Sequence, residues 1–253
     1  MKFSVIIPSY NQERFIGSTL ENVVRLKSDA AEKGTEIEII LIDSESNAEV
    51  QKIISLFRKD LDHIDISKDK GQYDAINKGL KICSGDYWTW LNTDDHIDIN
   101  GFFKLVEILK KDPDIDYIYG GIQYMDTDNK LIKDVKAKIF TLDSLVNLDP
   151  GIYQPGSFFK TSFTRTVGEI SAYRCCFDYE YILRCLKKYA KIYVCDFPVA
   201  RFRYYSDSKT GSMIPVFIRE QLLISKDFGR KPYSKLTWFS NLRLLKHRLF
   251  PRQ

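Results

Sequence analysis

The segment KFSVIIPSYN (residues 2–11) opens with a run of apolar, largely β-branched residues and closes with polar ones. Such a run predicts a buried strand over residues 2–8, ended by Pro8. A second apolar run, IEIILI (residues 37–42), predicts another strand that stops at Asp43. Between them, apolar residues at near-helical spacing predict a helix over residues 11–31.

The same alternation continues along the chain. Further helices are predicted over residues 50–57, 73–83 and 102–111, and further strands over residues 63–66, 87–91 and 117–119. Strands that alternate with helices indicate an α/β fold, with a mostly parallel sheet covered by helices on both faces. Ligands of such sheets bind beyond the carboxyl ends of the strands. Polar clusters fall at those positions: Ser9-Tyr10-Asn11, Asp43, and Asp94-Asp95.

Composition is typical of a globular protein, with 44% hydrophobic and 28% charged residues among 253. The five cysteines show no CxxC spacing, so we expect small buried hydrophobes rather than a zinc site, and a reducing cytoplasm. His63 and His96 lack metal-ligand spacing and are expected at the surface or in loops. The first residues become polar too quickly for a signal peptide, and no apolar run is long enough to span a bilayer.

The acidic pair Asp94-Asp95 follows the predicted strand YWTWL (residues 87–91). One or two carboxylates at a strand end suit Mn²⁺ or Mg²⁺, which keep several waters and bind substrate phosphates. A pair of this kind is also common in solvated turns and at helix starts, because Asp and Asn favour both. Taken alone, the pair therefore leaves a metal site and a plain turn open.

Three blocks, in order, resemble the inverting glycosyltransferases of family 2. The first is VIIPSYN (residues 5–11), and the second combines DKGQYDAINKG (residues 69–79), SGD (residues 84–86) and WLNTDD (residues 90–95). The third runs from QPGSFF (residues 154–159) through Gly168 and FDYE (residues 177–180) to Arg184. The resemblance covers about residues 3–212 and is most similar to bacterial enzymes that build surface polysaccharides.

The resemblance implies a GT-A fold over residues 1–212 and transfer of a hexose or N-acetylhexosamine from a UDP-sugar to a hydroxyl group. A nucleoside pocket is implied at Pro8, Ser9, Tyr10 and Asp43, and a ribose and phosphate site at Asp74, Lys78 and Asp94. Asp94 and Asp95 match the metal motif, with Asp95 as the more direct ligand. Asp178 matches the general base, while an N-cap of the following helix is a compatible alternative.

Aromatic residues and one arginine are further candidates. Trp88, Trp90 and Tyr153 are candidates to pack against sugar faces, although aromatics near strands are commonly core residues. Relatives often carry an Arg followed by a His near the end of the domain, where this chain has RFRYY (residues 201–205). Arg203 is a candidate for phosphate binding, and the Ser44–Asn47 turn departs from the usual Gly-rich pattern.

The C-terminal part is basic. Residues 201–253 carry a net charge of +9, against −5 for the first 200. Residues 213–253 are predicted to form a basic amphipathic helical extension that either binds an anionic membrane, near a lipid-linked or other saccharide acceptor, or packs on the domain. Without a nucleic-acid motif and with an acidic body, nucleic acid is not an expected partner.

Two other functions stay open. A sugar nucleotidyltransferase also uses carboxylates and a metal on an α/β sheet, but it usually has a Gly-rich basic loop where this chain has Ser9-Tyr10-Asn11-Gln12. A non-catalytic nucleotide- or sugar-binding module would retain the fold without the chemistry. The presence of both Asp95 and Asp178 favours an enzyme.

Overall fold

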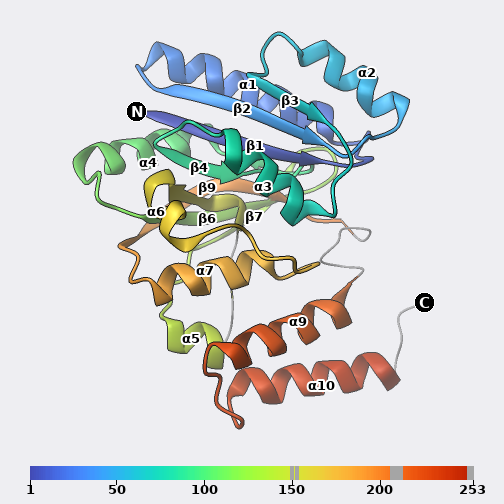
Figure 1. The fold of residues 1–253 in the computed structure, drawn as a ribbon, viewed down its shortest axis with the longest axis vertical. Helices are drawn as coiled ribbons and strands as arrows, with labels where there is room; N and C mark the ends of the chain where they lie inside the picture. Colours follow the sequence, from blue (N-terminus) through green and yellow to red (C-terminus); the bar gives the residue numbers. More distant parts are fainter. Residues whose placement is uncertain (149–150, 152–153, 206–212, 250–253) are drawn as a thin grey trace.

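A mixed β-sheet lies between two layers of helices in the computed structural model, which describes residues 1–148, 151, 154–205 and 213–249 (Figure 1). Its first four strands are β1 (Lys2–Ser9), β2 (Glu36–Asp43), β3 (His63–Ile66) and β4 (Tyr87–Trp90). The remaining strands are β5 (His96–Ile97), β6 (Tyr117–Met125), β7 (Leu131–Val135), β8 (Ser157–Lys160) and β9 (Ile192–Arg203).

The strand order is β3-β2-β1-β4-β8-β6-β9-β5, with β7 paired to β6. β1, β2, β3 and β4 run parallel to one another, as predicted. In the second half, β8 runs antiparallel to both of its neighbours, whereas β6 and β9 are parallel. The α/β architecture with a mixed sheet is therefore confirmed, and its parallel character is concentrated in the first half.

Helices cover both faces. One face carries α1 (Ile16–Glu32), α2 (Ala48–Phe57) and α4 (Ile99–Lys111). The other carries α3 (Gln72–Ile82), α5 (Leu142–Asn147), α6 (Thr161–Val167) and α7 (Phe177–Lys187). Two more helices, α9 (Ile214–Asp227) and α10 (Lys235–Leu249), follow on the α7 side, and a short 3-10 turn η1 spans Gln154–Gly156.

Alternation along the central strands assigns side chains to the two cores. In β1, Phe3, Val5 and Ile7 enter the core under α1, whereas Ile6 enters the core under α3. This alternation follows from the two-residue period of a strand. Helix α4 approaches β9 closely because Gly101 has no side chain: a Cβ there would lie 1.9 Å from the carbonyl oxygen of Pro198.

Three predicted boundaries were wrong: β6 continues to Met125 instead of ending at residue 119, α4 begins at Ile99 rather than residue 102, and the start of α1 differs most clearly in its cause. Helix α1 begins at Ile16 rather than near residue 11. Asn11 has a φ of 48°, which is incompatible with a right-handed helix. Its side chain instead accepts a hydrogen bond from the backbone N–H of Asn47, 2.9 Å away. Residues 11–15 thus belong to the loop at the carboxyl end of β1.

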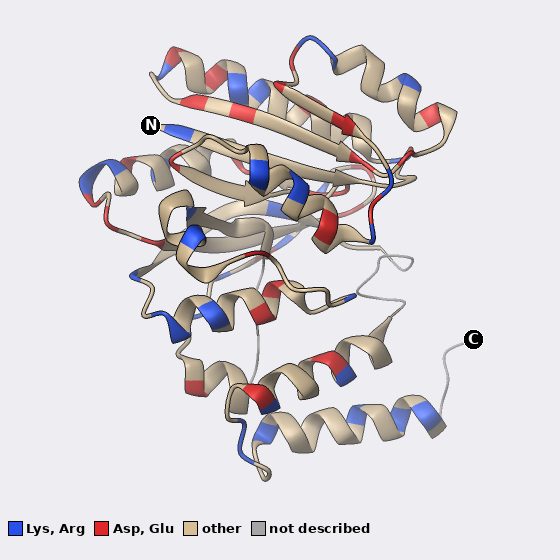
Figure 2. Cartoon of the chain, viewed as in Figure 1, with Lys and Arg blue, Asp and Glu red and all other residues tan. Residues whose placement is uncertain are grey.

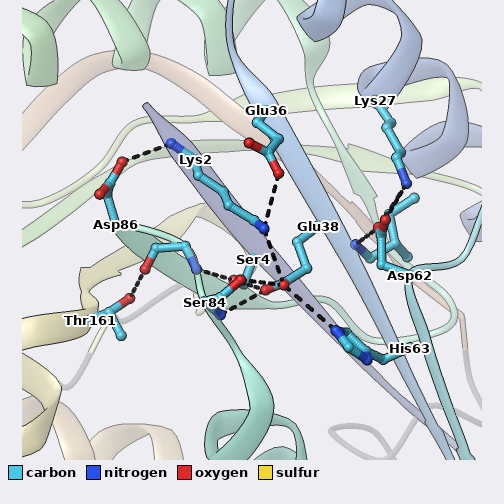
Figure 3. Close-up of polar contacts among 12 residues, drawn as sticks. Lys2, Ser4, Lys27, Glu36, Glu38, Asp62, His63, Ser84, Asp86 and Thr161 are labelled. Atoms are coloured by element: carbon cyan, nitrogen blue, oxygen red, sulfur yellow. Dashed lines mark hydrogen bonds and ion pairs between the residues drawn. The ribbon is translucent and has the colours of Figure 1, made fainter.

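A buried carboxylate holds the opposite, amino-terminal edge of the sheet together (Figure 3). Glu38 of β2 accepts hydrogen bonds from the hydroxyls of Ser4 and Ser84, each 2.5 Å long, and from the backbone N–H of Ser84 at 2.9 Å. The Lys2 ammonium lies 3.4 Å away. Burial alone would raise the pKa of Glu38, but these hydrogen bonds and the Lys2 charge outweigh it, and the pKa is lowered.

We expect Glu38→Gln to lower the free energy of unfolding by about 1.5–3 kcal/mol at pH 7, the range for hydrogen bonds to a charged group. Because the folded-state pKa is lowered, the contribution exists above the unfolded pKa of Glu and disappears as the pH falls through the folded value. Urea unfolding at pH 7 and below pH 4 measures this. Glu36→Gln, at an exposed ion pair with Lys2, is the control and should cost less than about 1 kcal/mol. Equal losses in the two variants would contradict the role of Glu38.

Candidate functional site

The loops at the carboxyl ends of β1, β2, β3 and β4 meet at one edge of the sheet and are tied to one another. Ser46 accepts a hydrogen bond from the backbone N–H of Asn11, 2.9 Å away, which joins the loops after β2 and β1. Ser44 accepts one from the backbone N–H of Asp69, at 3.1 Å. Gln72, at the start of α3, donates to Asn92 after β4 at 2.6 Å. Four segments that are distant in sequence therefore form one connected surface.

The residues after β1 differ sharply in exposure. Pro8 and Ser9 are buried, whereas Tyr10 is 62% exposed. The Ser9 hydroxyl is one of five buried side-chain N or O atoms that lack a hydrogen-bond partner among the described residues. Buried polar atoms are normally satisfied, so an unpaired hydroxyl at this edge is notable. The end of β1 therefore combines an exposed aromatic ring at Tyr10 with a buried, unpaired hydroxyl at Ser9.

Asp43 is fully buried, and its carboxylate is already occupied. It accepts hydrogen bonds from the backbone N–H of Ser46 (2.9 Å), the Ser46 hydroxyl (2.6 Å) and the amide of Gln51 (2.6 Å). These bonds close the Ser44–Asn47 turn and orient it toward Asn11. The three hydrogen bonds show that Asp43 organises this loop.

Asp74 and Lys78 of α3 also shape a loop. Asp74 accepts a hydrogen bond from the backbone N–H of Lys70, 3.0 Å away, at the start of the helix. The Lys78 ammonium donates to the hydroxyl of Ser67 and to the carbonyl of Lys68, both at 2.8 Å. Both side chains hold the segment between β3 and α3 against the sheet edge.

Asp94 and Asp95 point into different surroundings although they are adjacent. Asp95 is fully buried, and its two oxygens accept from the backbone N–H of Arg203 (3.0 Å) and the side chain of Asn92 (3.1 Å). Asp94 is half-buried, and its Oδ2 accepts from the hydroxyl of Tyr205 at 2.8 Å. Asp94 is therefore the acid at the accessible side of the pair, and Asp95 anchors the turn.

Burial dominates the electrostatics of this pair, although the Arg203 cation acts on both carboxylates. Burial raises the pKa of Asp94, against the opposing hydrogen bond from Tyr205. Burial, followed by the nearby charge of Asp94, raises the pKa of Asp95 well above its usual range. Two desolvated carboxylates side by side repel each other, and a bound cation would relieve that repulsion.

Arg203 is buried behind this turn and forms hydrogen bonds with it. Its guanidinium donates to the carbonyl oxygens of Asp94 (2.9 Å) and Asp126 (2.8 Å) and to the side chain of Asn129 (2.7 Å). It is 1% exposed and stacks over the ring of Phe15, 4.6 Å from its centre. The predicted role in phosphate binding is corrected accordingly, because every nitrogen of Arg203 has a partner inside the protein.

The fit of Mn²⁺ or Mg²⁺ can be judged from the donor set. Among the described residues no group of three or more His, Cys, Asp and Glu side chains comes together to hold a metal. Hard divalent ions in phosphate-transfer sites are often held by one or two carboxylates, with water and substrate phosphates completing the shell. The half-buried Asp94 carboxylate fits that mode, and an all-protein cage is absent from the described part of the chain.

Asp178 lies in the first turn of α7, which begins at Phe177 after the N-cap residue Cys176. The predicted N-cap alternative is therefore wrong. Glu220 of α9 instead holds the segment that leads into α7, because its carboxylate accepts hydrogen bonds from the backbone N–H groups of Arg174, Cys175 and Cys176 at 2.8–2.9 Å. Asp178 Oδ1 accepts from the backbone N–H of Tyr179, 2.7 Å away.

Packing brings the start of α7 to the end of β4. The ring of Phe177 lies 6.0 Å from the ring of Trp90, the last residue of that strand. Gln154 in η1 donates to the Trp90 carbonyl at 2.7 Å. Phe177, the neighbour of Asp178, thus contacts the strand that leads into the loop of Asn92 and Asp94.

Several other expectations are corrected by burial. Trp88 and Trp90 are buried in the core under α3 and stack 5.6 Å apart, so neither ring faces a ligand. His96 is buried in β5, bonded to Ser18 at 2.9 Å, rather than exposed. Burial, with the charges of Arg203 and Arg201, lowers the pKa of His96 to about 4. His63 is exposed, although in a strand, and Tyr153 lies outside the described residues.

Three contributors were missed: Tyr205, Gln72 and Glu220. The RFRYY segment had been noted, but only the course of β9 beyond the sheet shows that Tyr205 reaches Asp94. Gln72 lies within DKGQYDAINKG (residues 69–79), but nothing in that segment indicates its hydrogen bond to Asn92. Nothing local marks Glu220, whose partners lie about 45 residues earlier in the chain.

The sequence is similar to those of known glycosyltransferases. Residues 4–177 match the family model described as "Glycosyl transferase family 2". A mycobacterial protein, the PGL/p-HBAD biosynthesis glycosyltransferase of Mycobacterium bovis, is 24% identical over 195 residues, covering 75% of this chain and 72% of its own length. The poly-beta-1,6-N-acetyl-D-glucosamine synthase of Staphylococcus epidermidis is 30% identical over 119 residues, which are 46% of this chain and 27% of the synthase.

Solved structures agree on the fold. Residues 1–349 of TarS from S. aureus, crystallised with UDP, align with a TM-score of 0.66 at 17% identity, over 100% of this chain and 73% of theirs. The mannosyltransferase PcManGT of Pyrobaculum calidifontis, in complex with GDP-Man and Mn²⁺, gives 0.66 at 14% identity, over 99% and 76%. At these identities the likeness is one of fold, and it confirms the expected GT-A architecture.

Proposed function

This chain belongs to glycosyl transferase family 2, and on that premise we propose that it moves a hexose or N-acetylhexosamine from a UDP-sugar to an acceptor hydroxyl, with inversion at the anomeric carbon. One observation supports the proposal: Phe177, the neighbour of Asp178 at the start of α7, packs on Trp90, the last residue of the strand that Asp94 follows. The proposed metal ligand and the proposed base act on the same donor sugar, so both must lie near one end of the strand.

The donor nucleoside is assigned to the carboxyl end of β1 and β2. The exposed ring of Tyr10 is proposed to stack on the base, and the buried Pro8 and Ser9 are proposed to shape the pocket at the end of β1. Asp43 is proposed as a positioning residue, because its three internal hydrogen bonds hold the turn that forms the wall of this pocket. Asp74 and Lys78 are proposed to position the segment between β3 and α3, which would lie beside the ribose and phosphates.

The diphosphate is assigned to the surface in front of Asp94. A bound Mn²⁺ or Mg²⁺ would supply Lewis-acid neutralisation of the leaving UDP. Asp94 is proposed as the direct carboxylate ligand, oriented by the Tyr205 hydroxyl. Asp95, the ligand implied by the resemblance, is proposed to orient the turn through Asn92 and Arg203.

The transfer itself is assigned to Asp178. Its carboxylate takes the proton of the acceptor hydroxyl as that oxygen attacks the anomeric carbon, while the bond from this carbon to the diphosphate oxygen breaks and UDP leaves. A single displacement inverts the anomeric carbon and needs no covalent intermediate. The general base must lie across the sugar from the diphosphate, and Asp178 is proposed for this position because it lies on α7 and not on the loop that carries Asp94.

The acceptor is proposed to be a saccharide of a bacterial surface polysaccharide or a lipid-linked saccharide. The names of the relatives support this class: one acts in biosynthesis of PGL/p-HBAD, and another makes poly-beta-1,6-N-acetyl-D-glucosamine. The acceptor sugar and the linkage depend on one or two hydrogen bonds to ring hydroxyls.

Isothermal titration calorimetry with UDP, GDP, ADP and TDP, with and without Mn²⁺, tests the donor class. We expect binding of UDP that weakens at least about tenfold when EDTA removes the metal, because the diphosphate charge then faces Asp94 unscreened. Tighter binding of another nucleotide would reassign the donor. Binding of UDP without turnover of a panel of UDP-sugars would favour the non-catalytic binding module, and no binding of any nucleotide would overturn the proposal.

A further inference from the structure

Helix α10 packs on the protein with one narrow face. Leu236 and Ser240 are buried, and Leu244 and His247 are half-buried, at a spacing that puts all four on one side of the helix. Its base is anchored by the preceding loop, where the backbone N–H of Lys231 donates to Asn147 of α5 at 2.8 Å. Of the two alternatives for this extension, the structure therefore shows packing on the domain through one face of α10.

The opposite face of α10 is apolar and open. Trp238, Leu242, Leu245 and Leu249 follow one another at intervals of four, three and four residues, so they form a single stripe. Their side chains are 63%, 50%, 52% and 62% exposed. Phe239, 52% exposed, packs edge-to-face on Trp238 beside the stripe. Scattered exposed apolar residues are ordinary, but an aligned row is typical of an interaction surface.

Basic residues flank this stripe and no acidic residue interrupts it (Figure 2). Lys235, Arg243, Lys246 and Arg248 are all exposed on α10. The sequence from residue 228 to residue 249 contains no Asp or Glu. Helices that combine a row of Trp and Leu with flanking Lys and Arg lie in the headgroup region of anionic bilayers.

We propose that the exposed face of α10, the Trp238–Leu249 stripe with its basic flanks, docks on an anionic membrane surface. An apolar stripe of this kind could contact either a second copy of the chain or a membrane, and the positive charge beside it favours the membrane. A second copy would bring two sets of uncompensated positive charges together, whereas an anionic bilayer neutralises them. No helix of the described residues is long and apolar enough to cross a bilayer, so this contact lies in the interface plane.

The docking face lies on the α7 side of the molecule. In Figure 1, α7, α9 and α10 follow one another away from the sheet. Glu220 links α9 to the start of α7 through its bonds to the backbone of Cys175 and Cys176. The inference goes beyond the proposed function and does not depend on it. If both hold, the helix that carries Asp178 is on the membrane side of the enzyme.

Flotation of the full chain with vesicles tests the proposal. We expect binding to vesicles of 70% phosphatidylcholine and 30% phosphatidylglycerol, at least about tenfold stronger than to pure phosphatidylcholine and weakened by salt. The stripe variant, Trp238→Ser with Leu242→Ser and Leu245→Ser, should bind at least tenfold more weakly. Its control is Leu56→Ser with Leu131→Ser and Ile132→Ser, which removes exposed apolar side chains from α2 and β7.

A second pair of variants tests the charge. Arg243→Gln with Lys246→Gln and Arg248→Gln should lower binding to the anionic vesicles at least about tenfold. Lys104→Gln with Lys110→Gln and Lys111→Gln removes the same charge from α4 and should leave binding within about twofold.

Tryptophan fluorescence provides a readout that does not need the stripe variant to fold. The chain has three tryptophans, and Trp88 and Trp90 are in the core. A blue shift on addition of anionic vesicles should therefore come from Trp238 and vanish in Trp238→Phe, which still floats. Absence of both flotation and blue shift in the wild-type protein would overturn the proposal. So would a dimer, measured by light scattering, that the stripe variant dissociates while vesicles have no effect.

Discussion

Asp94→Asn is expected to lower kcat/KM for the UDP-sugar by about 100- to 1,000-fold, the loss typical when a group that stabilises developing charge is removed. Asp94 is the accessible member of the acidic pair, and its Oδ2 is held by the Tyr205 hydroxyl. An amide keeps the shape and the hydrogen bond but loses the charge that attracts a divalent cation. The metal dependence of UDP binding, measured by calorimetry, should largely disappear.

The same variant should remain folded. Burial raises the pKa of both carboxyls, and the charge of Asp94 raises the pKa of Asp95 further, so keeping both ionised costs folding free energy. Removing one charge should leave the melting temperature unchanged or higher in the absence of metal. Asp128→Asn, at an exposed position in the turn between β6 and β7, is the control and should retain activity. Full activity of Asp94→Asn would shift the metal assignment back to Asp95.

Asp178→Asn should lower kcat by about 100- to 10,000-fold, the range for general acid–base catalysis, with the affinity for UDP changed less than twofold. Asp178 sits in the first turn of α7, whose start is fixed independently by Glu220 and by the contact of Phe177 with Trp90. The helix should therefore keep its position when the carboxylate becomes an amide. A loss of kcat without a loss of donor affinity separates a base from a structural residue.

The measurement is a single-turnover assay of UDP release, with acceptor present. Asp227→Asn, which removes an exposed carboxylate from the last turn of α9, is the matched control and should be fully active. Unchanged turnover in Asp178→Asn would remove it from the mechanism. An equal fall in donor affinity and kcat would indicate instead that Asp178 shapes the donor pocket.

Local sequence was sufficient for most elements of the first half of the chain. β3 has the predicted bounds, His63–Ile66, and β1, β2, α2 and α3 each begin and end within about two residues of the prediction. These segments are short apolar runs or regular apolar repeats, and burial of their side chains on the predicted faces explains why local periodicity is informative. The start of α1 was missed because Asn11 pairs with Asn47, 36 residues away.

The sequence by itself determined that the polar clusters after β1, β2 and β4 share one sheet edge, because parallel strands present their carboxyl ends together. Only the tertiary structure decided which of those polar groups face outward. Asp43, Asp95 and Arg203 are buried with partners inside the protein, whereas Tyr10 is exposed and Asp94 is only half-buried. Orientation and burial depend on contacts such as Tyr205 with Asp94 and Glu220 with Cys176, which join residues 111 and 44 positions apart. No local pattern encodes contacts over such distances, because they arise only when the sheet and its covering helices are assembled.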